Sequence, residues 1–223
     1  MKLKEICSYL DSAIPLSIQE NYDNSGLQTG DPETEIDSAL LSLDATVEVI
    51  EEAAGSGCGL VITHHPVIFH PLKSLTGRTK AEQIIAMAIR HNIAVYSSHT
   101  SLDARSGGVS IKLAEKAGLE NIRVLKPLEN SLVKLITFVP SDHAGKVREA
   151  IFKAGAGVIG NYDMCSYNVE GYGTFRGNEM TNPFAGRKGE MHMEPETRIE
   201  TIMPSYISGK VVAALIEAHP YEE

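Results

Sequence analysis

The chain has 223 residues, of which 43% are hydrophobic, so it has enough apolar sequence for a folded core and is not a disordered chain. It carries 20 basic and 29 acidic residues, for a formal net charge of −9. This balance disfavours a protein that binds the nucleic-acid backbone and suits one that binds a cation.

The remaining composition favours a cytoplasmic protein that needs no covalent cross-links. The three cysteines, Cys7, Cys58 and Cys165, are odd in number and far apart, so neither a disulfide framework nor a thiolate zinc site is expected. The N-terminus lacks an apolar signal-peptide core, and no stretch approaches the roughly 20 apolar residues of a membrane span.

The first half of the chain alternates between short apolar runs and helical patterns. Strands are predicted over residues 39–43, 59–62 and 93–96. Helical spacing of apolar residues covers residues 3–10, 47–54, 81–88 and 109–117. This β-α-β-α-β-α alternation predicts a parallel sheet with right-handed crossovers, in an α/β lobe over residues 1–126.

A new pattern begins near Lys126-Pro127. Strands are predicted over residues 132–139, 166–175 and 198–203, and helices over residues 144–154 and 211–218. The β-α-β-β-α order is that of a ferredoxin-like α+β domain without its last strand. We assign this second, incomplete domain to residues 127–223.

Imidazole and carboxylate groups follow each predicted strand of the first lobe. Asp44 follows the first strand, His64 and His65 the second, and His99 and Asp103 the third. The carboxyl ends of parallel strands share one edge of a sheet, where ligand chemistry gathers. Neutral imidazole and carboxylate together suit zinc, iron, nickel or manganese.

Two interpretations fit the strand-end histidines equally well. Either they bind metal, or they only cap the strand ends and bond to loop backbone. Asp44 also has two interpretations, as a partner that orients a ligand imidazole or, preferred on pattern, as the cap of the following helix. The segment Tyr22–Gly26 has the composition of a turn and is interpreted as structural.

Three segments of the first lobe form a distinctive combination: Tyr22–Gln28, Thr63–Pro66 and Ser98–Asp103. Together they resemble the NIF-three-like family, whose members are commonly named GTP cyclohydrolase 1 type 2 homologues. The second half is similar to the PII/CutA-like domain inserted in many bacterial members, and the matching segments are Ala154–Tyr162, Arg198–Thr201 and Ala218–Glu223. The match runs in order over essentially the whole chain.

The resemblance implies a site for two divalent metal ions in which His64, His65 and Asp103 match family ligands. His99 and Asp44 are candidates for residues that support those ligands. The family's other ligands, a His and a Glu four residues apart, lie after the insert near the end of a longer chain. His219 and Glu223 have this spacing but belong to the insert's own motif, so we expect a chain truncated within the insert.

The resemblance further implies a homohexamer and a metal-dependent hydrolase-like activity on an unknown small molecule, with no catalytic residue assigned. Two metal ions would activate water for attack on carbon or phosphorus. The alternative is a non-enzymatic metal-binding or regulatory module whose insert senses a small molecule or a protein. No membrane or nucleic-acid partner is expected.

Overall fold

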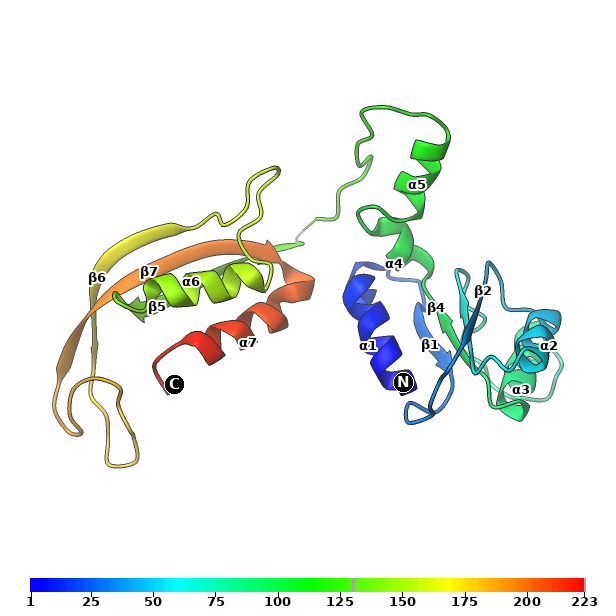
Figure 1. Ribbon diagram of the computed structural model, residues 1–223, viewed down its shortest axis with the longest axis horizontal. Helices are drawn as coiled ribbons and strands as arrows, with labels where there is room; N and C mark the ends of the chain where they lie inside the picture. Colours follow the sequence, from blue (N-terminus) through cyan, green and yellow to red (C-terminus); the bar gives the residue numbers. More distant parts are fainter. Residues whose placement is uncertain (130, 223) are drawn as a thin grey trace. The chain divides into compact units, whose positions relative to one another are not determined.

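A computed structural model describes residues 1–129 and 131–222. The chain folds into two compact units, Met1–Lys126 and Pro127–Glu223 (Figure 1). Within the described residues, no helix is long and apolar enough to cross a membrane.

The first unit is built on a four-stranded sheet with the strand order β1-β4-β3-β2. The strands are β1 (Gly26–Thr29), β2 (Ala39–Ser42), β3 (Leu60–Thr63) and β4 (Ala94–Ser97). β2, β3 and β4 are parallel, but β1 pairs antiparallel with β4. The prediction of a purely parallel sheet was therefore wrong, because β1 is a four-residue strand with no apolar run to mark it.

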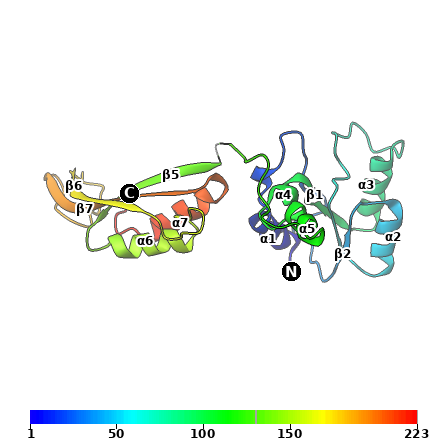
Figure 2. The same ribbon diagram turned by 90° about the horizontal axis from the view of Figure 1, so that it is seen from above.

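Helices cover both faces of this sheet, with α1 on one side and α2 and α3 on the other (Figures 1 and 2). The helices are α1 (Leu3–Ala13), α2 (Val47–Gly55), α3 (Lys80–Arg90), α4 (His99–Ala104) and α5 (Val109–Lys116), with a short 3-10 helix η1 (Leu16–Ile18). Because strand side chains alternate between faces, Val61 and Val95 pack with α2 and α3, while Leu60 and Tyr96 pack with α1.

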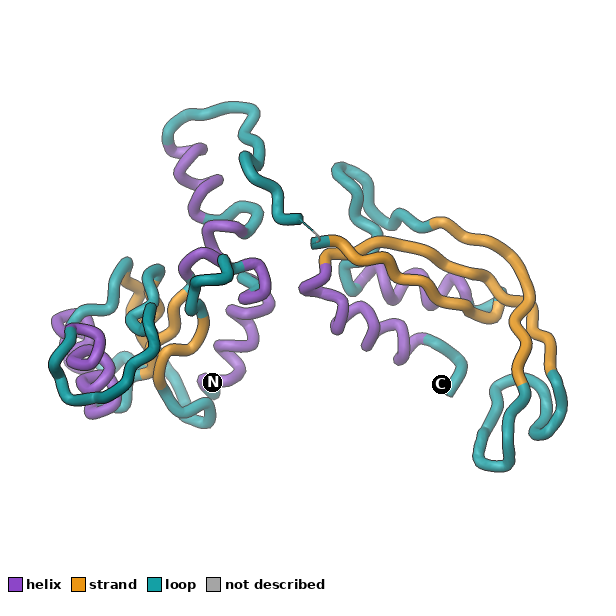
Figure 3. The backbone as a smooth tube through the Cα atoms, turned by 180° about the vertical axis from the view of Figure 1, so that it is seen from behind, coloured by secondary structure: helices purple, strands orange, loops and turns teal. Residues whose placement is uncertain are grey.

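The second unit is a three-stranded antiparallel sheet with the order β5-β7-β6. Its elements are β5 (Leu132–Pro140), α6 (Ala144–Lys153), β6 (Tyr167–Phe175), β7 (His192–Pro204), a 3-10 helix η2 (Ser205–Ile207) and α7 (Ser208–Ala218). α6 and α7 lie side by side along the sheet (Figure 3). The core between helices and sheet includes Val139, Ile151, Ile199 and Val211.

β7 begins well before the predicted strand at Arg198. The additional residues include Pro195, which lacks the N–H of a strand residue. Pro195 pairs with Tyr172 of β6, but the pairing with β5 stops one residue later, at Glu196. Because Pro195 lies on this unpaired margin, its missing donor disrupts no second ladder.

A buried carboxylate in the first turn of α3 holds the loop that precedes this helix. Glu82 is 7% exposed and accepts hydrogen bonds from the backbone N–H groups of Thr76 (2.8 Å) and Arg78 (3.1 Å) and from the Thr76 hydroxyl (3.0 Å). These hydrogen bonds hold the pKa of Glu82 below its ordinary value of 4.5, and the bond from the Thr76 backbone N–H has the largest effect.

We expect Glu82→Gln to lower the melting temperature most at neutral pH, because a neutral amide accepts these hydrogen bonds less strongly than a carboxylate. A lowered folded-state pKa stabilises the fold above the unfolded-state pKa, and this contribution is lost as the pH falls through the folded-state value. The difference from wild type should therefore shrink in acid. Thermal melts over a pH series measure it, with Glu51→Gln on exposed helix surface as the control; a difference independent of pH contradicts the prediction.

Candidate metal site

The site lies where β3 and β4 end. Thr63 and Ser97, the last residues of the two strands, are paired in register. Their hydroxyls are 2.8 Å apart and buried, and they contact the carbonyl oxygen of His65 at 2.9 and 3.3 Å. The end of the sheet thus fixes the backbone of the first residues beyond it.

The turn after β3 is also fastened to the end of β2. The backbone N–H groups of His64 and His65 both donate to the carbonyl of Leu43, at 3.2 and 3.1 Å. Consecutive side chains on a regular strand point to opposite faces. Because the strand has ended here, both imidazoles can lie on one side of the turn.

Three imidazoles form a triangle at this edge. The ring centroids are 4.9 Å apart for His64 and His65, 5.4 Å for His64 and His99, and 5.5 Å for His65 and His99. One ring nitrogen from each lies within 4.8 Å of the other two. When such nitrogens bind a single ion at about 2 Å each, they lie at most about 4 Å from one another. Small side-chain rotations would therefore allow the three rings to bind one ion.

Carboxylates orient two of the three rings. Nδ1 of His65 lies 2.7 Å from Oδ1 of Asp44, and Nδ1 of His99 lies 2.8 Å from Oδ1 of Asp23. An ionised carboxylate only accepts hydrogen bonds, so Nδ1 carries the proton in both rings. The lone pair is then on Nε2, which is the arrangement typical of histidines that bind metal.

His64 and Asp103 complete the cluster. Nδ1 of His64 is buried and has no hydrogen-bond partner among the described residues, while Nε2 lies 3.7 Å from Oδ2 of Asp103. His99 and Asp103 are four residues apart on α4, a spacing that places both on one helix face. An unpartnered buried ring nitrogen and a carboxylate beside three imidazoles make a donor set that fits a divalent metal ion.

Asp23 connects this cluster to α4. Its buried carboxylate accepts hydrogen bonds from the Thr100 backbone N–H (2.9 Å), the Thr100 hydroxyl and His99. Burial raises the pKa of Asp23, but these hydrogen bonds outweigh it and hold the pKa well below its ordinary value. Asp23 is therefore an anion that orients the His99 ring and accepts a hydrogen bond from a backbone N–H in the first turn of α4.

Other residues of the Tyr22–Gln28 segment fasten the loop that carries the histidines. The side-chain amide of Asn24 donates to the carbonyl of Ile68 (2.6 Å), and Gln28 accepts from the Ile68 backbone N–H (3.1 Å). Gln28 also donates to the carbonyl of Asn24 at 2.7 Å. The segment thus has a specific role beside the site, beyond the turn that its composition predicts.

The structure brings the predicted ligands His64, His65 and Asp103 to the same sheet edge, with His99 among them and Asp44 bonded to His65. The preferred interpretation of Asp44 as a helix cap was wrong, because Thr46 caps α2 by accepting from the Val49 N–H.

Asp23 was missed as a site residue. The composition around Asp23 predicts only a turn, and the one signal that marked this segment is the resemblance of Tyr22–Gln28 to the family.

The candidate pair His219 and Glu223 can be followed only at His219. Nε2 of His219 donates to the carbonyl of Phe138 at 2.9 Å, and its Nδ1 accepts from the Tyr221 backbone N–H at 3.1 Å. Both ring nitrogens are therefore engaged. Glu223 lies outside the described residues.

Known proteins of similar sequence are named GTP cyclohydrolase 1 type 2 homolog. That of Halalkalibacterium halodurans is 45% identical over 210 residues, which cover 94% of this chain and 56% of the relative. That of Bacillus subtilis is 37% identical over 221 residues, which cover 99% of this chain and 59% of the relative. The chain thus spans less than three-fifths of the length of these relatives.

A solved structure shares the fold as well as the sequence. The Bacillus cereus protein related to NIF3 superposes with a TM-score of 0.85 at 40% identity, covering 100% of this chain and 59% of that one. Residues 1–179 match the Duf34/NIF3 (NGG1p interacting factor 3) family. The resemblance to the NIF-three-like family is confirmed, and the chain belongs to the Duf34/NIF3 family.

Proposed function

We propose that this chain binds a divalent metal ion through His64, His65, His99 and Asp103. The observation that supports this most is the triangle of imidazoles, with one nitrogen of each within 4.8 Å of the others and two rings oriented by carboxylates. Histidines that only cap strand ends would not need their three rings to converge. The mixture of imidazole and carboxylate is compatible with zinc, iron, nickel or manganese.

His65→Ala is expected to weaken metal binding by at least about tenfold, since it removes one ligand nitrogen and frees Asp44. His143→Ala is the matched control, because His143 makes the same Nδ1–carboxylate contact with Asp142 (2.7 Å) but belongs to the second unit. Metal analysis and titration of the purified variants measure the difference. Equal affinities in both variants contradict the site.

We further propose that the whole protein is a hydrolase-like enzyme with a dinuclear centre. A metal ion held here would supply a Lewis acid that activates water for attack on an electrophilic carbon or phosphorus. The chain's own part is to hold the ligand rings: Asp44 and Asp23 fix the orientation of His65 and His99. The longer relatives have additional sequence beyond the region matched by this chain. We propose that the remaining ligands of the dinuclear centre come from sequence of that kind.

Turnover assays test this enzymatic role separately from metal binding. Metal-loaded full-length protein is assayed against nucleotides and phosphoesters, with His65→Ala as the metal-depleted control. Metal-dependent turnover that is lost in His65→Ala supports the hydrolase. Intact metal binding without turnover on any of these compounds favours the alternative, a non-enzymatic metal-binding or regulatory module.

We propose that the second unit is an inserted ferredoxin-like domain of the PII/CutA-like type. We also propose that the whole protein forms a cytoplasmic homohexamer. Its element order β5-α6-β6-β7-α7 and its sheet order β5-β7-β6 support this, because they are those of the first five elements of that fold. Light scattering of full-length protein tests the hexamer.

A further inference from the structure

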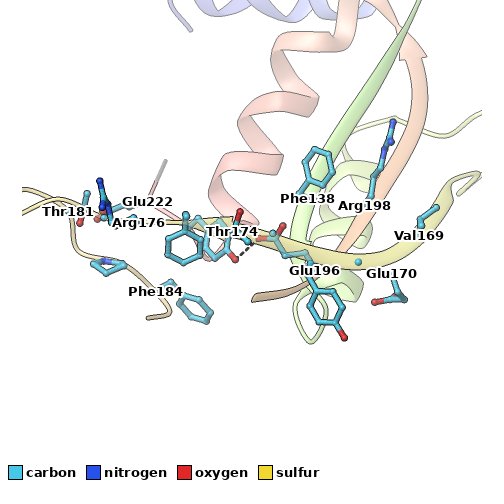
Figure 4. A pocket seen from close by; sticks show the side chains of 17 residues that line it. Phe138, Val169, Glu170, Thr174, Arg176, Thr181, Phe184, Glu196, Arg198 and Glu222 are labelled. Carbon is cyan, nitrogen blue, oxygen red and sulfur yellow. Dashed lines mark hydrogen bonds between the residues drawn. The ribbon is translucent and has the colours of Figure 1, made fainter. Parts of the chain in front are cut away.

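The second unit contains a cavity whose lining includes none of the residues of the candidate metal site. Its volume is about 680 Å³, which is within the usual range for a small-molecule site. It is lined by strand β6, by residues of the loop after it, and by side chains from β5, β7 and the C-terminal segment (Figure 4). The residues used below are Phe138, Phe175, Phe184, Glu196, Arg198 and Tyr221.

Glu196 places a buried carboxylate in the wall of this cavity. It is only 7% exposed, and its side chain lies against Gly173, where a Cβ atom would overlap it. Oε1 accepts a hydrogen bond from the Tyr221 hydroxyl at 2.7 Å (Figure 4). Oε2 is the atom of this side chain that lies nearest Gly173, and no hydrogen bond to Oε2 is found among the described residues. One oxygen of a carboxylate that is more than nine-tenths buried is thus left for a ligand.

Tyr221 is held as a donor to Glu196. Its backbone N–H donates to His219, whose own Nε2 donates to the carbonyl of Phe138. The rings of Phe175 and Phe184 stand 5.9 and 6.2 Å from the Tyr221 ring. Burial and then the hydrogen bond to Glu196 raise the pKa of the Tyr221 hydroxyl, so it stays protonated.

Most other charges around the cavity already have partners. Arg198 forms an ion pair with Glu200 (2.6 Å) and lies 5.9 Å from the centre of the Phe138 ring. The two oxygens of Glu170 accept from Ser141 and Thr197, each at 2.9 Å. Arg176 lies with Thr181 and Glu222 at the end of the cavity away from Phe138 (Figure 4). The free acceptor in the middle is Oε2 of Glu196.

We propose that this cavity binds an organic ammonium compound whose N–H group donates to Oε2 of Glu196 and whose apolar part lies against Phe138, Phe175 and Phe184. A carboxylate oxygen without a donor can accept a charge-assisted hydrogen bond from an ammonium group, which is stronger than a bond between neutral groups. Aromatic faces attract cations in addition to burying apolar surface. The contact of Arg198 with Phe138 shows that a cation already lies near an aromatic ring of this wall.

The test uses three probes of nearly equal shape and different charge: phenethylamine, phenethyl alcohol and hydrocinnamate. Each is titrated into the full chain and followed by calorimetry and by NMR. The amine should bind at least about tenfold more tightly than the alcohol, since a charge-assisted hydrogen bond to a buried carboxylate is stronger than a neutral one. The anion should bind more weakly than both.

Glu196→Gln should reduce amine affinity by at least about tenfold and leave alcohol affinity within about twofold. Glu190→Gln, in an exposed loop, makes the same change of net charge and should alter neither. Phe184→Leu changes a half-exposed residue of the cavity wall and should weaken amine binding several-fold. It provides the test if Glu196→Gln does not fold. Equal amine and alcohol affinities, no binding at millimolar concentration, or unchanged amine binding in the variants overturns the proposal; Glu196 then serves only to hold Tyr221.

Discussion

Replacing Asp23 by Asn is expected to weaken metal binding by about 10–100-fold, although Asp23 is not itself a proposed ligand. The carboxylate makes Nδ1 of His99 the protonated nitrogen and so leaves the Nε2 lone pair for a metal ion. An amide that presents its NH2 group to the ring would favour the opposite tautomer. An amide that presents its oxygen would lose the charge that strengthens the bond.

The matched control for this prediction is Asp142→Asn. Asp142 contacts Nδ1 of His143 at 2.7 Å, the same kind of pair as Asp23 and His99, but it is exposed and belongs to the second unit. Competition titrations against a chelator give the metal affinity of each variant, and circular dichroism shows whether α4 and the fold are retained. An unchanged affinity in Asp23→Asn, or an equal loss in both variants, contradicts the positioning role.

Much of the candidate site could be predicted because strand ends are visible in the sequence. The apolar runs before Thr63 and Ser97 mark two neighbouring parallel strands, and their observed register places Thr63 opposite Ser97. Residues directly after the two strands must then lie close together, whatever the details of the loops. His64, His65 and His99 meet for this reason.

Asp23 and α4 could not be predicted because their stability comes from contacts distant in the sequence. α4 has only six residues, several of them poor helix formers, and no side-chain cap from its own N-cap residue. The carboxylate that accepts from its first turn comes from Asp23, 77 residues before Thr100. Local patterns carry no information about such a partner, so the sequence predicted no helix directly after β4.

In the second unit, too, the elements that the sequence predicted are those whose apolar pattern is local. Apolar alternation in β5 and helical spacing in α6 arise from burial on one face, which the sequence records directly. The first part of β7 pairs mainly with β6 and contains Pro195 between two glutamates, so neither its apolar pattern nor its propensity indicates a strand. The hydrogen bond between Tyr221 and Glu196 joins residues 25 positions apart, so local patterns do not indicate it either.

Ile151→Ala is expected to destabilise the second unit by about 2–5 kcal/mol, the usual cost of removing a fully buried aliphatic side chain and leaving a cavity. Ile151 lies on α6 and is completely buried in the core with Val139, Ile199 and Val211. Ile216→Ala is the control, because Ile216 on α7 is 68% exposed and its loss should change stability by less than about 0.5 kcal/mol. Urea denaturation of the purified variants measures both changes.

The effect of Ile151→Ala should be confined to residues 127–223. The core around Ile151 contains no residue of Met1–Lys126, and the metal cluster lies wholly within that first unit. Two compact units with separate cores can unfold separately, so the variant should show an earlier transition for the second unit. Its metal affinity, measured below that transition, should stay within about twofold of wild type. A single cooperative transition, or loss of metal binding together with the second unit, would show that the two units depend on each other for stability.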